Sequence, residues 1–229
     1  MKIITKILRA GRPDRRSRFH TGTGILVPVK RWAHFLLATF SWAKLRMGSK
    51  LEVRPWLSYS AVERINALLP ANANVLEVGS GQSTLWLAPR CAHLLSIESD
   101  RHWFESLHKK IATSGYNHVD LRYIWVASEM CDFREIADGS LDFALVDGGP
   151  RFEVLKMALP KVKSGGFVYV DNTDEDSISG GCRSALIAHA KQVGGSIEFF
   201  SDFSPCTPHA TEGVLWISPK TWAPSGSSS

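Results

Sequence analysis

The sequence has 229 residues, which is enough for one α/β domain with an appendage, and its hydrophobic content of 44% and charged content of 21% are ordinary for a folded globular protein. Its four cysteines lie far apart and form no CxxC or Cys–His pair. This spacing argues against a zinc site and against a disulfide framework, and it favours a reducing compartment.

The net charge of +5 is concentrated at the N-terminal end. Residues 1–58 carry thirteen Lys and Arg against Asp14 and Glu52, a net charge of +11, whereas the remainder has a net charge of −6. Such a segment suits contact with anionic lipid, a nucleotide-linked substrate or nucleic acid, and a solvated arm is the open alternative. The apolar stretch at 32–42 is too short to span a bilayer. The first twenty residues have no continuous apolar core and therefore do not resemble a secretory signal. We expect a cytoplasmic protein in which residues 1–50 make peripheral contact with an anionic membrane.

The hydrophobic pattern predicts two helices upstream, at residues 30–47 and 56–69. Ser58 or Ser60 would cap the second helix, and Pro70 lies beyond its end. Downstream, short β-branched runs alternate with helical stretches. Strands are predicted at 74–78, 93–98, 119–126, 141–147, 166–171, 196–200 and 214–218. Helices are predicted at 83–92, 101–114, 151–159 and 184–193.

This alternation predicts a doubly wound α/β domain with a mostly parallel sheet covered on both faces. The last two strands are joined without a helix, which predicts an antiparallel hairpin at one edge. We therefore divide the chain into a basic helical extension at 1–58, a domain at 59–220 and a flexible tail at 221–229, which ends in SGSSS.

A nucleotide site is predicted where the first strand ends. In VLEVGSGQST, at 75–84, a buried strand runs into a turn with Gly79 and Gly81, and a helix follows directly. Glycine permits close approach of a ligand to the backbone, and the free N–H groups of the helix start favour an anionic group. The second strand ends in Glu98, where such a site needs a carboxylate to accept hydrogen bonds from both ribose hydroxyls.

The same residues select the nucleotide. A dinucleotide site prefers G-x-G-x-x-G, but the third position here is Thr84. Glu77, two residues before Gly79, suits a positively charged ligand better than a pyrophosphate. S-adenosylmethionine (SAM) carries a sulfonium and an ammonium group, so the sequence favours SAM and disfavours a hydride-carrying dinucleotide.

With these motifs the sequence resembles the class I SAM-dependent methyltransferases over about residues 55–218. VLEVGSGQST is similar to their first motif and SIESD to their second, and the closing hairpin fits their seven-stranded, Rossmann-like sheet. The runs RPWLS, LVDGGPR and GGFVYVDN are similar to a bacterial-type subgroup that is often associated with modification of glycans or other secondary products.

The resemblance implies a set of cofactor contacts. Glu77, Gly79 and Gly81 would line the methionine and sulfonium end. Turn contacts would come from Ser80, Gln82, Ser83 and Thr84. Glu98 would hold the ribose, Ser128 and Glu129 would lie near the adenine, and Asp147 would also contact the cofactor.

Two acidic strand ends, Asp147 and Asp171-Asn172, are the predicted catalytic positions. They resemble the magnesium-binding Asp, Asp and Asn of the catechol and caffeoyl-CoA type O-methyltransferases, and their oxygen donors suit a hard cation such as Mg²⁺. The chain departs from that pattern because Pro150 stands where those enzymes have a lysine base. Without a metal, Asp147 would orient SAM or the acceptor and Asp171 would act as general base. A turn or helix cap at Asp171-Asn172 is the structural alternative.

Two further features border the predicted site. Arg151 would clamp an acidic acceptor or form an ion pair with Asp147 or the acidic cluster at 174–176. The segment 202–213 is rich in turn residues and is predicted to be a loop that roofs the acceptor pocket. His209 in this loop is a weak candidate base, and Cys206 has no activating neighbour in sequence.

The sequence thus predicts a SAM-dependent methyltransferase that acts on a small-molecule or glycan-type acceptor, at oxygen. A nucleic-acid methyltransferase is the first alternative, but the chain has no Asn/Asp-Pro-Pro-Tyr motif for a flipped base. A non-catalytic SAM-binding protein is the second alternative, and a nucleotide-binding oxidoreductase is the third.

Overall fold

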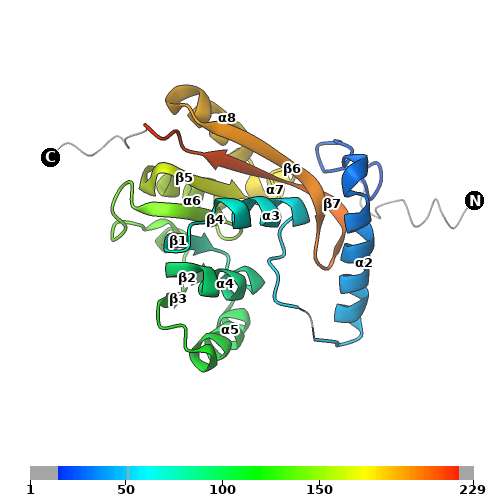
Figure 1. Ribbon diagram of the computed structural model, residues 1–229, viewed down its shortest axis with the longest axis horizontal. Helices are drawn as coiled ribbons and strands as arrows, with labels where there is room; N and C mark the ends of the chain where they lie inside the picture. Colours follow the sequence, from blue (N-terminus) through cyan, green and yellow to red (C-terminus); the bar gives the residue numbers. More distant parts are fainter. Residues whose placement is uncertain (1–14, 51, 222–229) are drawn as a thin grey trace, which may run out of the picture.

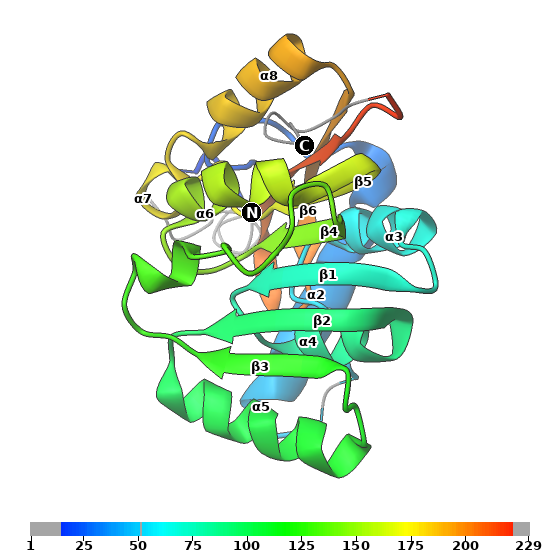
Figure 2. The same ribbon diagram turned by 90° about the vertical axis from the view of Figure 1, so that its left-hand side faces the viewer.

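The computed structural model describes residues 15–50 and 52–221, so most of the predicted tail lies outside the described residues. The described chain forms one seven-stranded sheet in the order β3-β2-β1-β4-β5-β7-β6 (Figures 1 and 2). Only β7 is antiparallel to its neighbours β5 and β6; the other pairs are parallel. The strands are β1 (Ala73–Val78), β2 (Cys91–Glu98), β3 (Val119–Tyr123), β4 (Leu141–Val146), β5 (Val162–Val170), β6 (Ser196–Ser204) and β7 (Thr207–Ile217). The predicted doubly wound α/β fold is confirmed.

Apolar residues on both faces of the central strands bury two separate cores, as expected for a parallel sheet between helices. On one face, Leu76 of β1 and Ala144 of β4 belong to a core with α6 (Arg151–Ala158) and α8 (Cys182–Val193). On the other face, the alternate residues Val75 and Phe143 pack with α3 (Tyr59–Leu68) and α4 (Gln82–Leu87). Helix α5 (Arg101–Ser114) covers β2 and β3.

The helix ends follow local chemistry. Asp100 accepts a hydrogen bond from the Trp103 amide at 2.7 Å and starts α5, and Gly115, with φ +71°, ends it. Ser58 caps α3 in the predicted manner. Helix α4 is shorter than predicted: Pro89 lies in the 3-10 turn η2 (Ala88–Arg90), and β2 begins directly after it. The sequence pattern missed the one-turn helix α7 (Asp176–Ser179).

The predicted loop at 202–213 is wrong. These residues belong to β6 and β7, which pair up to Ser204 and Thr207 around a tight turn in which Cys206 has φ +61°. Pro205 and Pro208 mask the strand pattern in the sequence. The outer part of this hairpin is stable because Phe203 and Ala210 are buried against the N-terminal segment.

That N-terminal segment consists of η1 (Val29–Arg31), α2 (Ala33–Arg46) and the chain around them, and it packs on the β6–β7 hairpin (Figure 1). Polar contacts fix it in place. His34 Nδ1 lies 2.9 Å from the buried Asp202 carboxylate, and Arg31 donates to the Ser201 carbonyl at 3.1 Å. Across residues 15–50 and 52–221, the structure has no helix with the length and apolar character needed to cross a bilayer.

Candidate functional site

The site is built around two backbone turns that touch. Gly79, between β1 and α4, has φ +97°, and a Cβ there would lie 2.6 Å from the Gly148 nitrogen. A Cβ on Gly148, after β4, would in turn lie 2.6 Å from the Gly79 Cα atom. Both positions therefore require glycine, the first also because of its backbone conformation. The sequence predicted Gly79 as a site residue and missed Gly148, although Gly148 lies in the LVDGGPR run.

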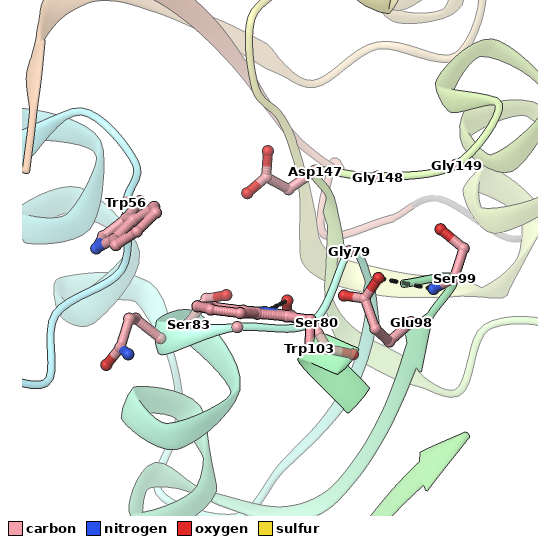
Figure 3. A pocket seen from close by; sticks show the side chains of 12 residues that line it. Trp56, Gly79, Ser80, Ser83, Glu98, Ser99, Trp103, Asp147, Gly148 and Gly149 are labelled. Atoms are coloured by element: carbon pink, nitrogen blue, oxygen red, sulfur yellow. Dashed lines mark hydrogen bonds between the residues drawn. The ribbon is translucent and has the colours of Figure 1, made fainter. Parts of the chain in front are cut away.

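A pocket of about 350 Å³ opens beside these turns, at the carboxyl edge of β1, β2 and β4 (Figure 3). Its volume falls at the lower end of the range for small-molecule sites. Seven lining residues were predicted from the sequence: Gly79, Ser80, Gly81, Gln82, Ser83, Glu98 and Asp147. The other five were missed: Trp56, Ser99, Trp103, Gly148 and Gly149.

Glu98 forms one side of the pocket. Its Oε1 accepts hydrogen bonds from the Ser99 and Asp100 amides, both at 2.7 Å, which fixes the carboxylate at the end of β2 (Figure 3). Burial raises the pKa of this carboxyl, and the two amides partly offset the shift. Glu98 and Gly79 therefore face one pocket, as the sequence predicted.

Glu77 lies beneath the glycine turn and does not line the pocket. Its Oε2 accepts hydrogen bonds from Thr84 Oγ1 and Ser96 Oγ, both at 2.5 Å, and Thr84 Oγ1 accepts one from the Gly81 amide at 2.8 Å. Burial raises the pKa of Glu77 to about 7 despite hydrogen bonds from neighbouring hydroxyls. In this position Glu77 and Thr84 shape the turn and join it to β2.

Ser128 and Glu129 also lie away from the pocket. Both are exposed at the start of the 3-10 turn η3 (Glu129–Cys131), and Glu129 borders a separate hollow that includes Arg122. Ser99, which directly follows Glu98, lines the pocket instead.

Two tryptophans from distant parts of the chain flank the pocket. Trp103, in the first turn of α5, donates from Nε1 to the Ser80 carbonyl at 2.7 Å. Trp56, in the segment that leads into α3, has its ring centroid 6.2 Å from that of Trp103. Both side chains remain more than a third exposed. Two sequence features could have identified these residues: Trp56 lies in the RPWLS run, and Trp103 follows shortly after the strand that ends in Glu98.

Arg151, at the start of α6, joins the ends of β4 and β5. Its Nη2 donates to the Asp147 carbonyl at 2.5 Å and lies 3.1 Å from Asp147 Oδ1. Its Nη1 donates to the Asp171 carbonyl at 2.6 Å and to Asn172 Oδ1 at 3.0 Å. The guanidinium is buried between both predicted catalytic positions. Of the two roles predicted for Arg151, the geometry shows the ion pair.

Asp147 and Asp171 differ in their access to the pocket. Asp147 lines it, and its carboxylate points into the hollow in Figure 3. Asp171 is 5% exposed and accepts a hydrogen bond from the buried Tyr169 hydroxyl at 3.0 Å. Burial raises the pKa of Asp147 well above its usual value, with repulsion from Asp171 adding to the shift and Arg151 opposing it. Burial likewise raises the pKa of Asp171 to about 6.

Solved structures resemble this architecture, whereas no family model and no curated protein matches the sequence. A Staphylococcus aureus protein provisionally named as a caffeoyl-CoA O-methyltransferase is 17% identical, with a TM-score of 0.59, and the match covers 83% of this chain and all of that one. An O-methyltransferase from Bacillus cereus in complex with SAH is 16% identical, with a TM-score of 0.56, over 85% and 93% of the two chains. The chain has the fold of the class I SAM-dependent methyltransferases. An rRNA methylase from Streptococcus thermophilus shares this fold at 10% identity and a TM-score of 0.52, over 70% and 95% of the two chains.

Within this methyltransferase fold, the predicted magnesium donors do not fit a divalent ion. The Arg151 guanidinium already contacts Asp147 Oδ1 and Asn172 Oδ1, and Asp171 Oδ1 accepts from Tyr169. A dication bound to Asp147 Oδ1 and Asn172 Oδ1 would have to displace this buried cation. Apart from this Asp, Asp and Asn set, the described residues contain no group of three or more His, Cys, Asp and Glu side chains that could hold a metal.

Proposed function

We propose that the chain transfers the methyl group of SAM to a hydroxyl oxygen of a small-molecule or glycan-type acceptor. The observation that carries this proposal is one pocket bounded by the Gly79–Gly81 turn, the Glu98 carboxylate and the Asp147 carboxylate. We assign this activity to residues 59–220. The extension at 1–58 contributes Trp56 to the wall of the pocket.

Each wall suits a different part of SAM. Glu98, held by two amides at the end of β2, would accept hydrogen bonds from the ribose hydroxyls. The turn with Gly79 and Gly81 lets the ligand approach the backbone closely. Asp147 and the rings of Trp56 and Trp103 would stabilise the positive charges of the sulfonium and ammonium groups, the carboxylate by Coulomb attraction and the rings by cation–π contact.

Methyl transfer needs alignment of the acceptor and removal of one proton. The acceptor oxygen attacks the methyl carbon in line, the bond from carbon to sulfur breaks, and SAM leaves as neutral S-adenosylhomocysteine (SAH). Asp147 borders the pocket and its carboxylate pairs with Arg151, so we assign it as the group that accepts the hydroxyl proton. The Arg151 guanidinium contacts Asp147 Oδ1 at 3.1 Å and fixes the position of this carboxylate.

Asp171 receives a different role from the one that the sequence suggested. Because it is almost fully buried and does not line the pocket, we assign it as a positioning residue. Its backbone carbonyl accepts a hydrogen bond from Arg151, and its carboxylate fixes Tyr169.

Calorimetry and a transfer assay test the proposal. We expect SAM and SAH to bind at one site and NAD to bind poorly, and Glu98→Ala to weaken SAM binding by about 10- to 100-fold, the loss of one or two hydrogen bonds to a charged group. Glu105→Ala, an exposed position on α5, is the matched control. Binding of NAD in preference to SAM would contradict the assignment.

The transfer assay uses labelled SAM and a cell extract that is then fractionated by size and nuclease sensitivity. Label in small molecules or glycans supports the proposal. Label that nuclease releases from a large fraction would favour the nucleic-acid alternative. Tight SAM binding with no transfer to any fraction would favour a non-catalytic protein.

A further inference from the structure

Helix α2 presents most of its large apolar side chains to solvent, whereas Phe35 and the buried Ala38 pack toward the β6–β7 hairpin. Leu36, Phe40 and Met47 are 68%, 61% and 72% exposed, and at spacings of four and seven residues they lie along one side of the helix. A surface helix of a globular protein normally shows the opposite arrangement.

Polar contacts accompany Phe35 and Ala38 on the inward side of α2. His34 binds the buried Asp202 carboxylate, and Ser41 Oγ accepts a hydrogen bond from the Cys206 amide at 2.8 Å. These contacts fix the rotation of the helix, so the apolar stripe faces away from the β6–β7 hairpin. In Figure 1 the outer side of α2 faces no other described element.

The apolar surface extends beyond this stripe. We define the α2 surface as the exposed large apolar side chains of the N-terminal segment. They are Ile25, Leu26, Val29, Trp32, Leu36, Leu37, Phe40, Trp42, Leu45 and Met47. Exposed large apolar side chains that gather in one segment, rather than singly over the surface, mark an interaction site.

The positive charge of the N-terminal segment favours an anionic partner. Residues 15–50 contain eight Lys and Arg and no Asp or Glu. Lys44 lies over the Phe40 ring at 4.7 Å and Arg46 over the Trp42 ring at 5.5 Å, so cations border the apolar side chains directly. Exposed tryptophan, phenylalanine and leucine next to basic residues are typical of helices that lie in the interface of an anionic bilayer.

A second copy of the chain would be a poorer partner. In a twofold contact through the α2 surface, two segments that each lack acidic residues would face each other, and their like charges would repel. An anionic lipid surface supplies the missing negative charge. A cavity of about 280 Å³ beside the stripe is bordered by Lys44 and by the ion pair of Arg54 with Glu52.

We propose that the α2 surface docks the protein on an anionic membrane, with Leu36, Phe40 and Met47 entering the boundary between headgroups and acyl chains and Lys44 and Arg46 contacting lipid phosphates. This docking is independent of the proposed methyl transfer. It would hold the protein at a lipid surface through residues 25–47.

Vesicle flotation with the full-length chain tests the docking. We expect flotation with vesicles of phosphatidylcholine and phosphatidylglycerol in equal parts, and little or none with phosphatidylcholine alone. Replacing both cations, as Lys44→Gln with Arg46→Gln, should weaken binding by about 30-fold, because each basic residue near such a surface contributes about 1 kcal/mol. Leu36→Ser with Phe40→Ser should also weaken it. Met157→Ser, at a 45% exposed apolar position on α6, should leave binding unchanged.

Circular dichroism of each variant verifies that it is folded, and light scattering without vesicles gives the oligomeric state. Equal binding to both vesicle types, or equal binding of the wild type and the Lys44/Arg46 variant, would overturn the proposal. A dimer that Leu36→Ser with Phe40→Ser converts to a monomer would also overturn it, because the α2 surface would then be a subunit interface.

Discussion

Arg151 Nη1 donates to the side-chain oxygen of Asn172 at 3.0 Å, and Asn172 adopts a left-handed backbone conformation with φ +53°. Asparagine tolerates this conformation better than most residues. The contact directs the amide oxygen of Asn172 at a guanidinium, in the position where the resemblance to caffeoyl-CoA type enzymes implies a metal ion.

We therefore predict that methyl transfer by the wild-type protein does not depend on a divalent metal. Its rate should be unchanged after chelation with EDTA, and calorimetry with Mn²⁺ should show no stoichiometric binding. Arg151→Ala leaves the Asp147 carboxylate without its buried partner, so we expect a loss of about 3–5 kcal/mol in the free energy of unfolding. It should also create Mn²⁺ binding. Stoichiometric Mn²⁺ binding by the wild type would show that the guanidinium does not exclude the metal.

The contact between the two glycine turns predicts a position-specific loss of stability. Gly79→Ala combines a positive φ with a Cβ 2.6 Å from the Gly148 nitrogen, so we expect a loss of at least about 3 kcal/mol in the free energy of unfolding. Gly115→Ala is the matched control, because its φ is +71° but no atom lies within 4 Å of the added Cβ. It should lose only about 1–2 kcal/mol. Urea denaturation of both variants measures the difference; equal losses would mean that the close approach has no energetic effect.

Burial of Glu77 predicts a pH-dependent stability. Its pKa is raised from 4.5 to about 7 in the folded state, so the folded state binds the proton more tightly than the unfolded state does. Protonated Glu77 therefore contributes to the free energy of unfolding. This contribution is fully present below pH 4.5 and is lost as the pH rises to about 7, a change of about 3 kcal/mol. Glu77→Gln should remove this part of the pH dependence.

Urea denaturation across this pH range measures the effect. Glu105→Gln, whose side chain is half exposed, should follow the wild-type curve. If Glu77→Gln also follows it, the carboxyl of Glu77 has no raised pKa.

The two tryptophans of the pocket predict a fluorescence signal. The chain has eight tryptophans, and SAM should change the emission mainly of Trp56 and Trp103. Trp56→Phe and Trp103→Phe should each reduce this change, and Trp103→Phe should also weaken SAM binding by about fivefold, because it removes the hydrogen bond to the Ser80 carbonyl. Trp125→Phe, at a 71% exposed position outside the pocket, is the control. If only Trp125→Phe removes the change in emission, SAM does not bind in the proposed pocket.

Local sequence patterns were sufficient to predict the sheet, its antiparallel edge and the glycine turn. The turn is encoded within ten residues, and Glu98 follows from the alternation of strand and helix. Trp56, Gly148 and the central position of Arg151 depend on contacts between segments far apart in the chain, which no local pattern reports. Glu77 was assigned to the pocket because a carboxylate suits a cation, but its direction depends on the Ser96 and Thr84 hydroxyls, and these hold it beneath the turn.

The packing of the N-terminal segment on the β6–β7 hairpin also constrains the order in which the protein is assembled. In chain order α2 is synthesised before the strands on which it packs, since His34 precedes Asp202 by 168 residues. Until β6 and β7 are synthesised, Phe35 and Ala38 of α2 lack their partners Phe203 and Ala210. Apolar side chains without their native partners favour aggregation, so we expect the nascent chain to benefit from a chaperone during this interval.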